Sequence, residues 1–322
     1  MGVKNHNNLR FYFIRTLIFL CFIFFLITQT IQGVTLQDKN NLQSADLDWH
    51  FLPSYPNYAP VGVPDFDQRQ ADWRSWGFWS YCGPTAIANI LWWFDAKHSC
   101  SDGVPGDGID TYPLVKDYQA PGIPSPGPYS DDHNFNNIDD SQSTFDRLSR
   151  QGELIEQLAW YVNNDRCRIP FISIPGVHPF AMKWGVKQWM RDVGLSRDYS
   201  VEIVLKPDFL TVYEKVCNNA GVVLQFGFYI PGFELFPLIF HHYVTVAGVN
   251  YQGYIALSDP DWNLANPTSD PTLHNDASVV SHDIYQVNYS TPCPRISSWW
   301  IPEYATHRRV VVLSALIITE IE

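Results

Sequence analysis

The sequence is poor in basic residues and lacks the motifs of several common protein classes. Its 322 residues include 21 Lys and Arg against 33 Asp and Glu, for a formal net charge of -12. Nucleic acids and anionic membranes also carry negative charge, so this balance argues against either as a partner. The cysteines show no C-x-x-C spacing and no clustering with histidine, which gives a structural zinc site little support. No internal repeat, low-complexity tract or ATP-binding P-loop motif is present.

The composition is that of a folded protein with an export signal. Hydrophobic residues make up 46% of the chain, enough for a substantial core in one large or two small domains. Residues 1–33 form a signal-peptide pattern, because three basic residues and no acidic one accompany the apolar run from Thr16 to Thr28. Cleavage near Gly33 predicts a secreted protein with no membrane contact, whereas an uncleaved segment would hold it at the cell surface.

Proline-rich and glycine-rich stretches divide the rest of the chain. Residues 34–64, with "LPSYPNYAPVGVP", are interpreted as an extended lead-in, because proline suits neither a helix nor a central strand. We expect the compact domain to cover residues 65–322, with a Gly/Pro/Asp-rich surface insertion near residues 99–143. That insertion lacks the D-x-D-x-D-G spacing of a calcium loop, so we expect a solvated loop there and no metal.

Hydrophobic periodicity predicts a mixture of helices and strands. The segment 207–220 opens with Pro-Asp and stops at Gly221, as a helix does. Two apolar, β-branched runs flank the turn-forming "NYQG" and predict a hairpin. The predicted helices are 151–164, 182–195 and 207–220, and the predicted strands are 222–230, 241–249, 253–262 and 308–319.

Cys82 directly precedes a Gly-Pro pair and an apolar run in "WSYCGPTAIANILWWFD". Pro84 suits the first turn of a helix, where its missing N–H has no partner anyway. The apolar residues that follow recur at helical spacing, which places Cys82 at a helix N-terminus. There the helix dipole favours an anion and therefore a thiolate. A disulfide or a buried structural cysteine is the alternative for this position.

The number of cysteines favours a free thiol at Cys82. Removal of the signal peptide takes Cys21 with it and leaves five cysteines, an odd number. In an exported chain four of these could pair as disulfides, with Cys82 as the natural one to remain unpaired.

The predicted hairpin supplies a base and a carboxylate for such a thiol. Pairing across "NYQG" sets His242 opposite Asp261, and a tighter two-residue turn sets it opposite Asp259. Directly opposed residues point to the same face of a sheet, so either carboxylate would neighbour the imidazole. His241 remains an alternative to His242.

Taken together, "VPDFDQ…YCGPTAIANIL…HYVTVAGV…IALSDP" resembles a secreted C39-like member of the papain-like cysteine peptidase superfamily. The similarity runs from Val63 to Asp261 and implies an α+β, papain-like fold, in which a helical lobe carrying the nucleophile packs on an antiparallel β-sheet lobe. Its motifs match the nucleophile to Cys82, the histidine to His242 and the third member to Asp259. The family's oxyanion-hole glutamine corresponds to Gln68, with Gln70 as the alternative.

The resemblance implies a secreted cysteine peptidase that hydrolyses peptide or isopeptide bonds through a thioester acyl-enzyme. Its substrate would be a peptide or protein, and it would need no metal or organic cofactor. Transglutaminase-like or amidase chemistry at the same site is one alternative. The other is a non-catalytic secreted binding or adhesion module on a papain-like shell, which a disulfide at Cys82 would favour.

Overall fold

The computed structural model describes part of the chain in detail. The described residues are 49–55, 59, 62–66, 68, 74–75, 77–98, 112, 114–115, 154–166, 175–232, 240–261, 283–305 and 308–321. Contacts divide the chain into Met1–Asp46 and Leu47–Glu322, and every described residue belongs to the second unit. The predicted signal peptide, residues 1–33, lies outside them. Within these ranges no helix combines the length and apolar character needed to cross a membrane.

An antiparallel sheet of eight strands forms one half of the described structure. Along the sheet the order is β4-β10-β5-β6-β7-β8, while β1 pairs with β6 and β9 with β10. A separate pair, β2 (Arg74–Ser75) and β3 (Phe78–Trp79), directly precedes Cys82. The sheet strands are β1 (Trp49–Phe51), β4 (Tyr199–Leu205), β5 (Gly221–Phe228), β6 (His241–Asn250), β7 (Tyr254–Ser258), β8 (Asp283–Gln286), β9 (Trp300–Tyr304) and β10 (Arg308–Glu320).

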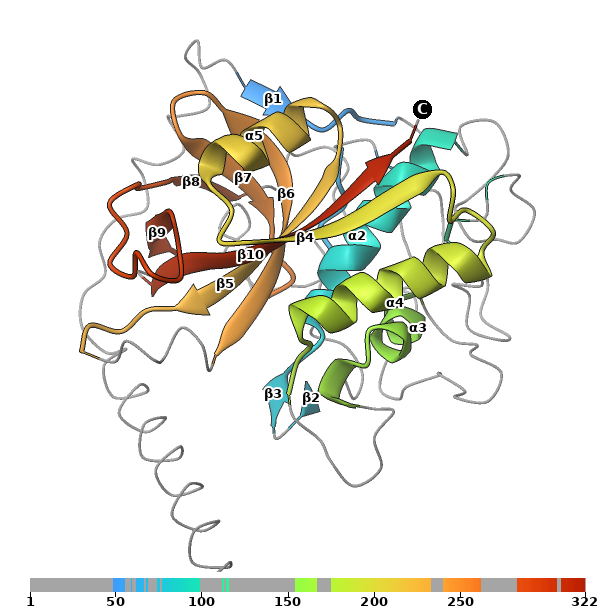
Figure 1. The fold of residues 1–322 in the computed structure, drawn as a ribbon, viewed down its shortest axis with the longest axis horizontal. Helices are drawn as coiled ribbons and strands as arrows, with labels where there is room; N and C mark the ends of the chain where they lie inside the picture. Colours follow the sequence, from blue (N-terminus) through green and yellow to red (C-terminus); the bar gives the residue numbers. More distant parts are fainter. Residues whose placement is uncertain are drawn as a thin grey trace, which may run out of the picture. The chain divides into compact units, whose positions relative to one another are not determined.

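Helices form the other half. Figure 1 shows α2, α3 and α4 gathered beside the sheet, and α5 lying across its strands. The mixed α+β class and the antiparallel sheet predicted from the sequence are therefore confirmed. The helices are α2 (Cys82–His98), α3 (Leu154–Tyr161), α4 (Pro179–Asp192) and α5 (Phe209–Cys217), with a short 3-10 turn η4 (Asn164–Arg166).

The helix α2 is buried on every side, which differs from the single apolar face expected of it. Every residue from Cys82 to Ala96 is buried. The helix contacts β5 and β6 on the sheet and also α3, so it has no face left for solvent. A helix that is apolar all round is typical of such a central position, and it anchors Cys82 in the core of the structure.

The other predicted helices begin and end at recognisable caps. Pro179 opens α4, and the His178 Nδ1 accepts a hydrogen bond from the Phe180 N–H. The Asp208 carboxylate caps α5 by accepting from the Thr211 N–H at 2.7 Å. This helix ends before Gly221, because the left-handed Asn219 already terminates it and Gly221 is the first residue of β5.

The hairpin of β6 and β7 has neither of the two turns predicted for it. Its loop is three residues long, with Asn250 paired to Tyr254, and a bulge between Val246 and Gly248 shifts the register by one residue. The Asn250 side chain closes the turn by accepting from the Tyr254 N–H at 3.0 Å. Pairing ends at Thr245 and Ser258, so the residues after Ser258 are released from the ladder.

The compact unit begins earlier than the predicted boundary at residue 65. Strand β1 pairs with β6, within the stretch expected to be an extended lead-in. The Pro53 carbonyl accepts from the Trp93 indole N–H at 2.8 Å, and Leu52 and Val63 are buried. Proline is compatible with these positions because β1 is a short strand and the prolines follow it.

Most of the predicted insertion at residues 99–143 lies outside the described residues, but two of its members are part of the core. Leu114 and Val115 are buried, and Leu114 accepts a hydrogen bond from the Trp189 indole at 2.7 Å. The Asp95 carboxylate accepts from the Val115 N–H at 2.6 Å. An apolar pair within a Gly/Pro-rich stretch is therefore packed against α2 and α4 instead of solvated.

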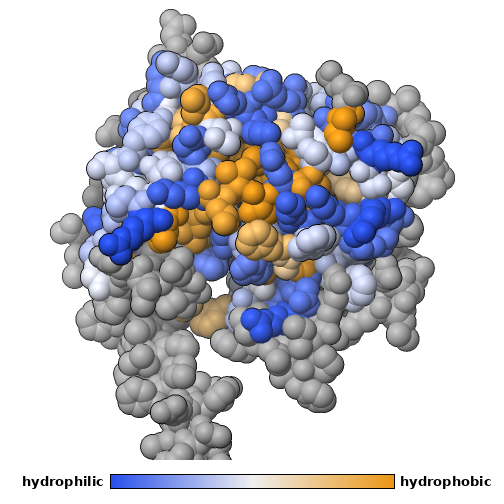
Figure 2. All heavy atoms as spheres, viewed as in Figure 1, coloured by the Kyte–Doolittle hydropathy of each residue, from blue (hydrophilic) through white to orange (hydrophobic). Residues whose placement is uncertain are grey.

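One face of the described structure carries an apolar patch. Figure 2 shows apolar side chains gathered in the middle of the face on which β4 and α5 lie, with hydrophilic side chains around them. Leu205 on β4 and Leu210 on α5 are both more than half exposed. Strand β4 stands at the end of the strand order, so among the described strands none pairs with its outer edge.

Candidate active site

Cys82 is the first residue of α2 and is buried, with 7% of its surface exposed. The first bond of the helix runs from the Thr85 N–H to the Tyr81 carbonyl at 3.0 Å, so the helix itself offers no acceptor for the Cys82 N–H. The predicted position at a helix N-terminus is confirmed. Cys82 is also a free cysteine in the structure, as expected of the residue left unpaired.

His242 lies at the start of β6 and contacts Asp259, which follows the end of β7. The imidazole Nε2 and the Asp259 Oδ1 are 2.7 Å apart, and both side chains are almost fully buried. Because Nε2 donates to the carboxylate, Nδ1 is left as the nitrogen that can accept a proton. The Cys82 side chain is a hydrogen-bonding neighbour of the same ring. The structure therefore brings Cys82, His242 and Asp259 together.

His241 and Asp261, the alternatives left open by the sequence, do not take the positions of His242 and Asp259. His241 is exposed, and successive residues of a strand point to opposite faces, so it does not share the position of His242. Asp261 contacts Asp259 through its backbone, with its N–H donating to the Asp259 Oδ1 at 3.0 Å. The charge of the Asp261 carboxylate instead acts on Arg308 of β10.

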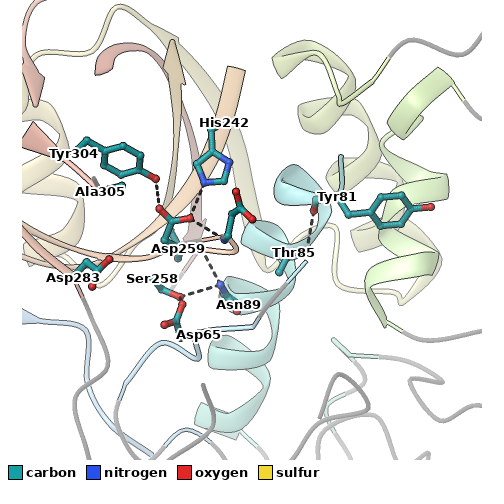
Figure 3. A network of polar contacts seen from close by, with 12 residues as sticks. Asp65, Tyr81, Thr85, Asn89, His242, Ser258, Asp259, Asp283, Tyr304 and Ala305 are labelled. Carbon is teal, nitrogen blue, oxygen red and sulfur yellow. Dashed lines mark hydrogen bonds and ion pairs between the residues drawn. The ribbon is translucent and has the colours of Figure 1, made fainter. Parts of the chain in front are cut away.

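Tyr304, at the end of β9, completes the surroundings of Asp259. Its hydroxyl donates to the Asp259 Oδ2, opposite the oxygen that His242 contacts. Figure 3 shows His242 and Tyr304 directed at the carboxylate from two sides. No local sequence pattern marks Tyr304 as part of the site, because it lies 45 residues beyond Asp259.

The electrostatics of the site favour a protonated imidazole. Burial by itself lowers the pKa of His242, but the charge and hydrogen bond of Asp259, together with the neighbouring Cys82, raise that pKa well above its ordinary value. An imidazole of this kind can hold the proton of a thiol, which stabilises a thiolate beside it. The arrangement thus combines a thiol, a base and a carboxylate that orients the base.

Gln68 lies beside the same turn. Its backbone N–H donates to the carbonyl of Pro260, the residue after Asp259, at 2.9 Å. Gln68 is 2% exposed, and its amide oxygen has no hydrogen-bond partner within the described residues. Buried amide groups are usually fully hydrogen-bonded, so this side chain is not explained by packing alone. Gln70 lies outside the described residues.

A buried polar network beneath the site joins α2 to the sheet. The Asn89 amide donates to the Ser258 hydroxyl at 3.1 Å and accepts from the Phe66 N–H at 3.0 Å. Ser258 in turn contacts the Asp65 carboxylate at 2.8 Å, as Figure 3 shows. The network holds the chain just before Gln68, at Asp65 and Phe66, and just before Asp259, at Ser258. A lone asparagine in the apolar run of α2 was the sequence signal for it.

A second carboxylate holds the segment before the nucleophile. The Asp165 Oδ2 accepts from the Ser80 hydroxyl at 2.7 Å, and its Oδ1 accepts from the Gly176 N–H at 2.6 Å. Burial raises the pKa of Asp165 to about 6, and the two hydrogen bonds offset only part of that rise. Asp165 has a positive φ of 50°, a backbone conformation that is uncommon for a residue with a side chain.

The residue after Gly176 joins the helical part of the site to the sheet. The Val177 carbonyl accepts from the Tyr243 hydroxyl at 2.9 Å. A Cβ atom added to Gly83 would lie 2.4 Å from the Val177 Cγ1, so only glycine fits the first turn of α2 against this side chain. The glycine of the "CGP" motif therefore allows the close approach of α2 to residue 177.

The remaining predictions about cysteines and metals are tested only in part. Cys217, on α5, is a second free cysteine and so takes no part in a disulfide in the structure, although it was one of the four cysteines expected to pair. Cys100 and Cys167 lie outside the described residues, so a disulfide that involves them stays a prediction. Among the residues that the structure describes, no group of three or more His, Cys, Asp or Glu side chains is arranged to hold a metal ion.

Comparison with known proteins adds no family. The chain matches no protein-family model, and no curated protein is similar enough to count as a relative. Any function therefore has to be argued from the site itself.

Proposed function

We propose that this protein is a papain-like cysteine peptidase in which Cys82, His242 and Asp259 act as the catalytic triad. The observation that carries the proposal is the buried His242–Asp259 pair at 2.7 Å, with the Cys82 side chain as a hydrogen-bonding neighbour of the same ring. The helical part that carries the nucleophile and the antiparallel sheet that carries the base are the two lobes of the proposed fold.

The reaction begins with proton transfer from the Cys82 thiol to the His242 Nδ1. The thiolate attacks the carbonyl carbon of a peptide or isopeptide bond, and the imidazolium returns its proton to the leaving amine. Water, deprotonated by His242, then hydrolyses the thioester and releases the acid. Asp259 holds the imidazole in the required tautomer and stabilises its protonated form, as the third member of such triads does.

The oxyanion of each tetrahedral intermediate needs hydrogen-bond donors. The backbone N–H of Cys82 is one, because the helix leaves it without an internal acceptor. The side-chain N–H of Gln68 is the other, a role supported by the burial of Gln68 and by its backbone bond to Pro260, the residue after Asp259. Loss of one such donor costs about 3 kcal/mol in the transition state.

The absence of a disulfide at Cys82 helps to distinguish catalysis from the alternative of a binding or adhesion module. A binding or adhesion module has no use for an ionised thiol, and a disulfide at Cys82 would have supported that alternative. The thiol is free in the structure, which favours catalysis. Hydrolysis and transfer of the acyl group to another amine use the same residues, and the acceptor alone distinguishes them. The N-terminal pattern supports action on peptides or proteins outside the cell or at its surface.

The test is the pH dependence of iodoacetamide alkylation, read at each cysteine by mass spectrometry. We expect Cys82 to react well below pH 8.5, roughly where ordinary thiols ionise, and to lose this reactivity in His242→Ala. Cys217, half-buried and free on the same chain, is the internal reference and should react as an ordinary thiol in both proteins. If Cys82 reacts like Cys217, or is unaffected by His242→Ala, the peptidase proposal is wrong.

A positive result leads to a substrate screen with the wild-type protein and Cys82→Ser. Hydrolysis of a peptide library that Cys82→Ser fails to cleave supports peptidase activity. Adding a primary amine then distinguishes transfer from hydrolysis, because an amide product forms only if the amine is accepted.

A further inference from the structure

The carboxylate of Asp259 has more hydrogen bonds than the triad needs. His242 and the Asp261 N–H both donate to Oδ1, and the Tyr304 hydroxyl donates to Oδ2. Asp259 is 1% exposed. An ionised carboxylate at such a position is costly unless hydrogen-bond donors replace the water that it has lost.

The hydroxyl of Tyr304 is held in place from several directions. Its ring packs edge-on against Phe226 at 5.2 Å and beside Tyr285 at 5.3 Å, and the residue has no exposed surface. The next residue, Ala305, has a positive φ of 49° and donates its N–H to the Tyr285 hydroxyl at 3.4 Å. The end of β9 is thus fixed, and the hydroxyl points at one carboxylate oxygen.

Tyr304 also has the right protonation state for a donor. Burial, and after it the charge of Asp259, raise the pKa of Tyr304 well above its ordinary value. The phenol therefore stays neutral over the range in which a Cys–His site works, and it donates throughout that range.

We propose that Tyr304 is a positioning residue of the active site, whose hydroxyl holds the Asp259 carboxylate oriented toward His242. This inference rests on the proposed function of the triad. Tyr304 touches neither the nucleophile nor the substrate, and it acts through Asp259 alone. Side-chain contacts thus link Cys82 on α2 to His242 on β6, His242 to Asp259 after β7, and Asp259 to Tyr304 on β9.

The inference differs from the simpler view that Tyr304 is a core aromatic whose hydroxyl needs a partner. Without the hydroxyl, the Asp259 carboxylate loses one of its hydrogen bonds and is held less firmly against His242. It then supports the imidazolium less well, and the Cys82 thiolate loses part of its stabilisation. A purely structural tyrosine would lower the stability of the fold without moving the pH dependence of Cys82.

Other titratable groups surround Asp259 and have to be considered in a pH experiment. Burial raises the pKa of Tyr285 well above its ordinary value, so this phenol does not titrate on the acid side. The hydroxyl that Tyr304→Phe removes donates to Asp259, so the substitution takes no hydrogen bond from Asp261 or Asp283. The groups are Cys82 on α2, His242 on β6, Tyr285 and Asp283 on β8, Tyr304 on β9, Arg308 on β10, and Asp261.

The experiment compares the pH profile of Cys82 alkylation in the wild-type protein and in Tyr304→Phe. Removing one hydrogen bond from the carboxylate should move the acid limb to higher pH and lower the alkylation rate near about pH 5 by about three- to tenfold. Tyr161→Phe is the matched control, because the Tyr161 hydroxyl donates to the Asp192 Oδ2 at 2.6 Å on distant helices. Its profile should coincide with that of the wild-type protein.

A double-mutant cycle tests whether Tyr304 acts through Asp259. In the Asp259→Asn background, Tyr304→Phe should cause no further change in Cys82 reactivity, because the carboxylate is already absent. An additive effect of the two substitutions contradicts the inference.

Site-specific replacement of Tyr304 by 3-fluorotyrosine covers the case in which Tyr304→Phe does not fold. The fluorinated phenol keeps the ring and has a more acidic hydroxyl, so it donates more strongly and should move the acid limb to lower pH. A wild-type profile with no activated Cys82 overturns the proposed function. An activated wild-type profile that Tyr304→Phe or the fluorinated residue leaves unmoved overturns this inference alone.

Discussion

The two sides of the candidate site are held by different kinds of interaction. On the sheet side, His242 and Asp259 are buried and linked to each other and to Tyr304 by hydrogen bonds. On the helix side, Cys82 depends on the close packing of Gly83 against Val177. The helix side thus tolerates little change in volume, whereas the sheet side tolerates little change in hydrogen bonding.

The two sides also differ in how the pKa values of their ionisable groups are shifted. The sheet side holds a pair of opposite charges, and its histidine has a raised pKa. The helix side holds Asp165, a carboxylate whose pKa burial raises to about 6 and which accepts a hydrogen bond from Ser80, two residues before the nucleophile. Protonation of Asp165 in mild acid therefore removes a negative charge from the helix side.

The largest expected effect is on the sheet side. Asp259→Asn keeps the shape of the carboxylate but removes its charge and favours the wrong imidazole tautomer, so peptide hydrolysis should fall by about 10⁴-fold. Asp261→Asn is the control, because its backbone N–H still donates to the Asp259 Oδ1. The measurement is kcat/KM on a substrate from the peptide screen. A greater loss in Asp261→Asn would make Asp261 the orienting residue.

A smaller effect is expected from packing on the helix side. Gly83→Ala places a Cβ 2.4 Å from the Val177 Cγ1, and such overpacking should lower the free energy of unfolding by about 1–3 kcal/mol. Urea denaturation measures the change. The added variant Val177→Ala makes room for the new methyl group and should restore part of the loss. No loss in Gly83→Ala, or no recovery in the double variant, would show that this contact is not tight.

The smallest effect is the pH dependence of stability that Asp165 adds. Because its pKa is raised from 3.8 to about 6, the folded protein keeps a proton that the unfolded chain has already released. Stability should therefore fall as the pH rises through this window, by about 1–2 kcal/mol after allowance for partial exposure. Asp165→Asn lacks this dependence. Urea unfolding of both proteins at several pH values measures it, and parallel curves would refute it.

Much of the fold could be predicted because its signals are local. Helical spacing after Cys82 predicted α2, and the Pro-Asp and apolar patterns predicted α4 and α5 within a few residues. The hairpin and the last strand follow from runs of β-branched residues. Strands β4, β8 and β9 and the buried pair Leu114 and Val115 were not predicted. Strand β4 and Leu114 have partners distant in sequence, namely β10 and Trp189, whereas β8 and β9 are short strands that pair with the neighbouring β7 and β10.

The sequence also specified which residue types approach one another, but not the register that brings them together. Pairing arguments left both Asp259 and Asp261 opposite His242. Past the bulge between Val246 and Gly248, Thr245 pairs with Ser258, and this register, if continued, would set His242 opposite Asp261. The end of pairing at Ser258 decides the matter, because beyond that point the Asp259 carboxylate contacts the imidazole. Neither a bulge nor the end of a ladder has a reliable sequence signature.

By itself, the sequence determined the acidic character of the chain, the helix that begins at Cys82, and the strands that carry His242 and precede Asp259. These depend on composition, on periodicity and on turn residues, all of which act over a few neighbouring positions. Only the tertiary structure decided that Tyr304 binds Asp259 across 45 residues and that Asp165 binds Ser80 across 85. Such contacts depend on strand pairing and helix packing, which no short stretch of sequence encodes.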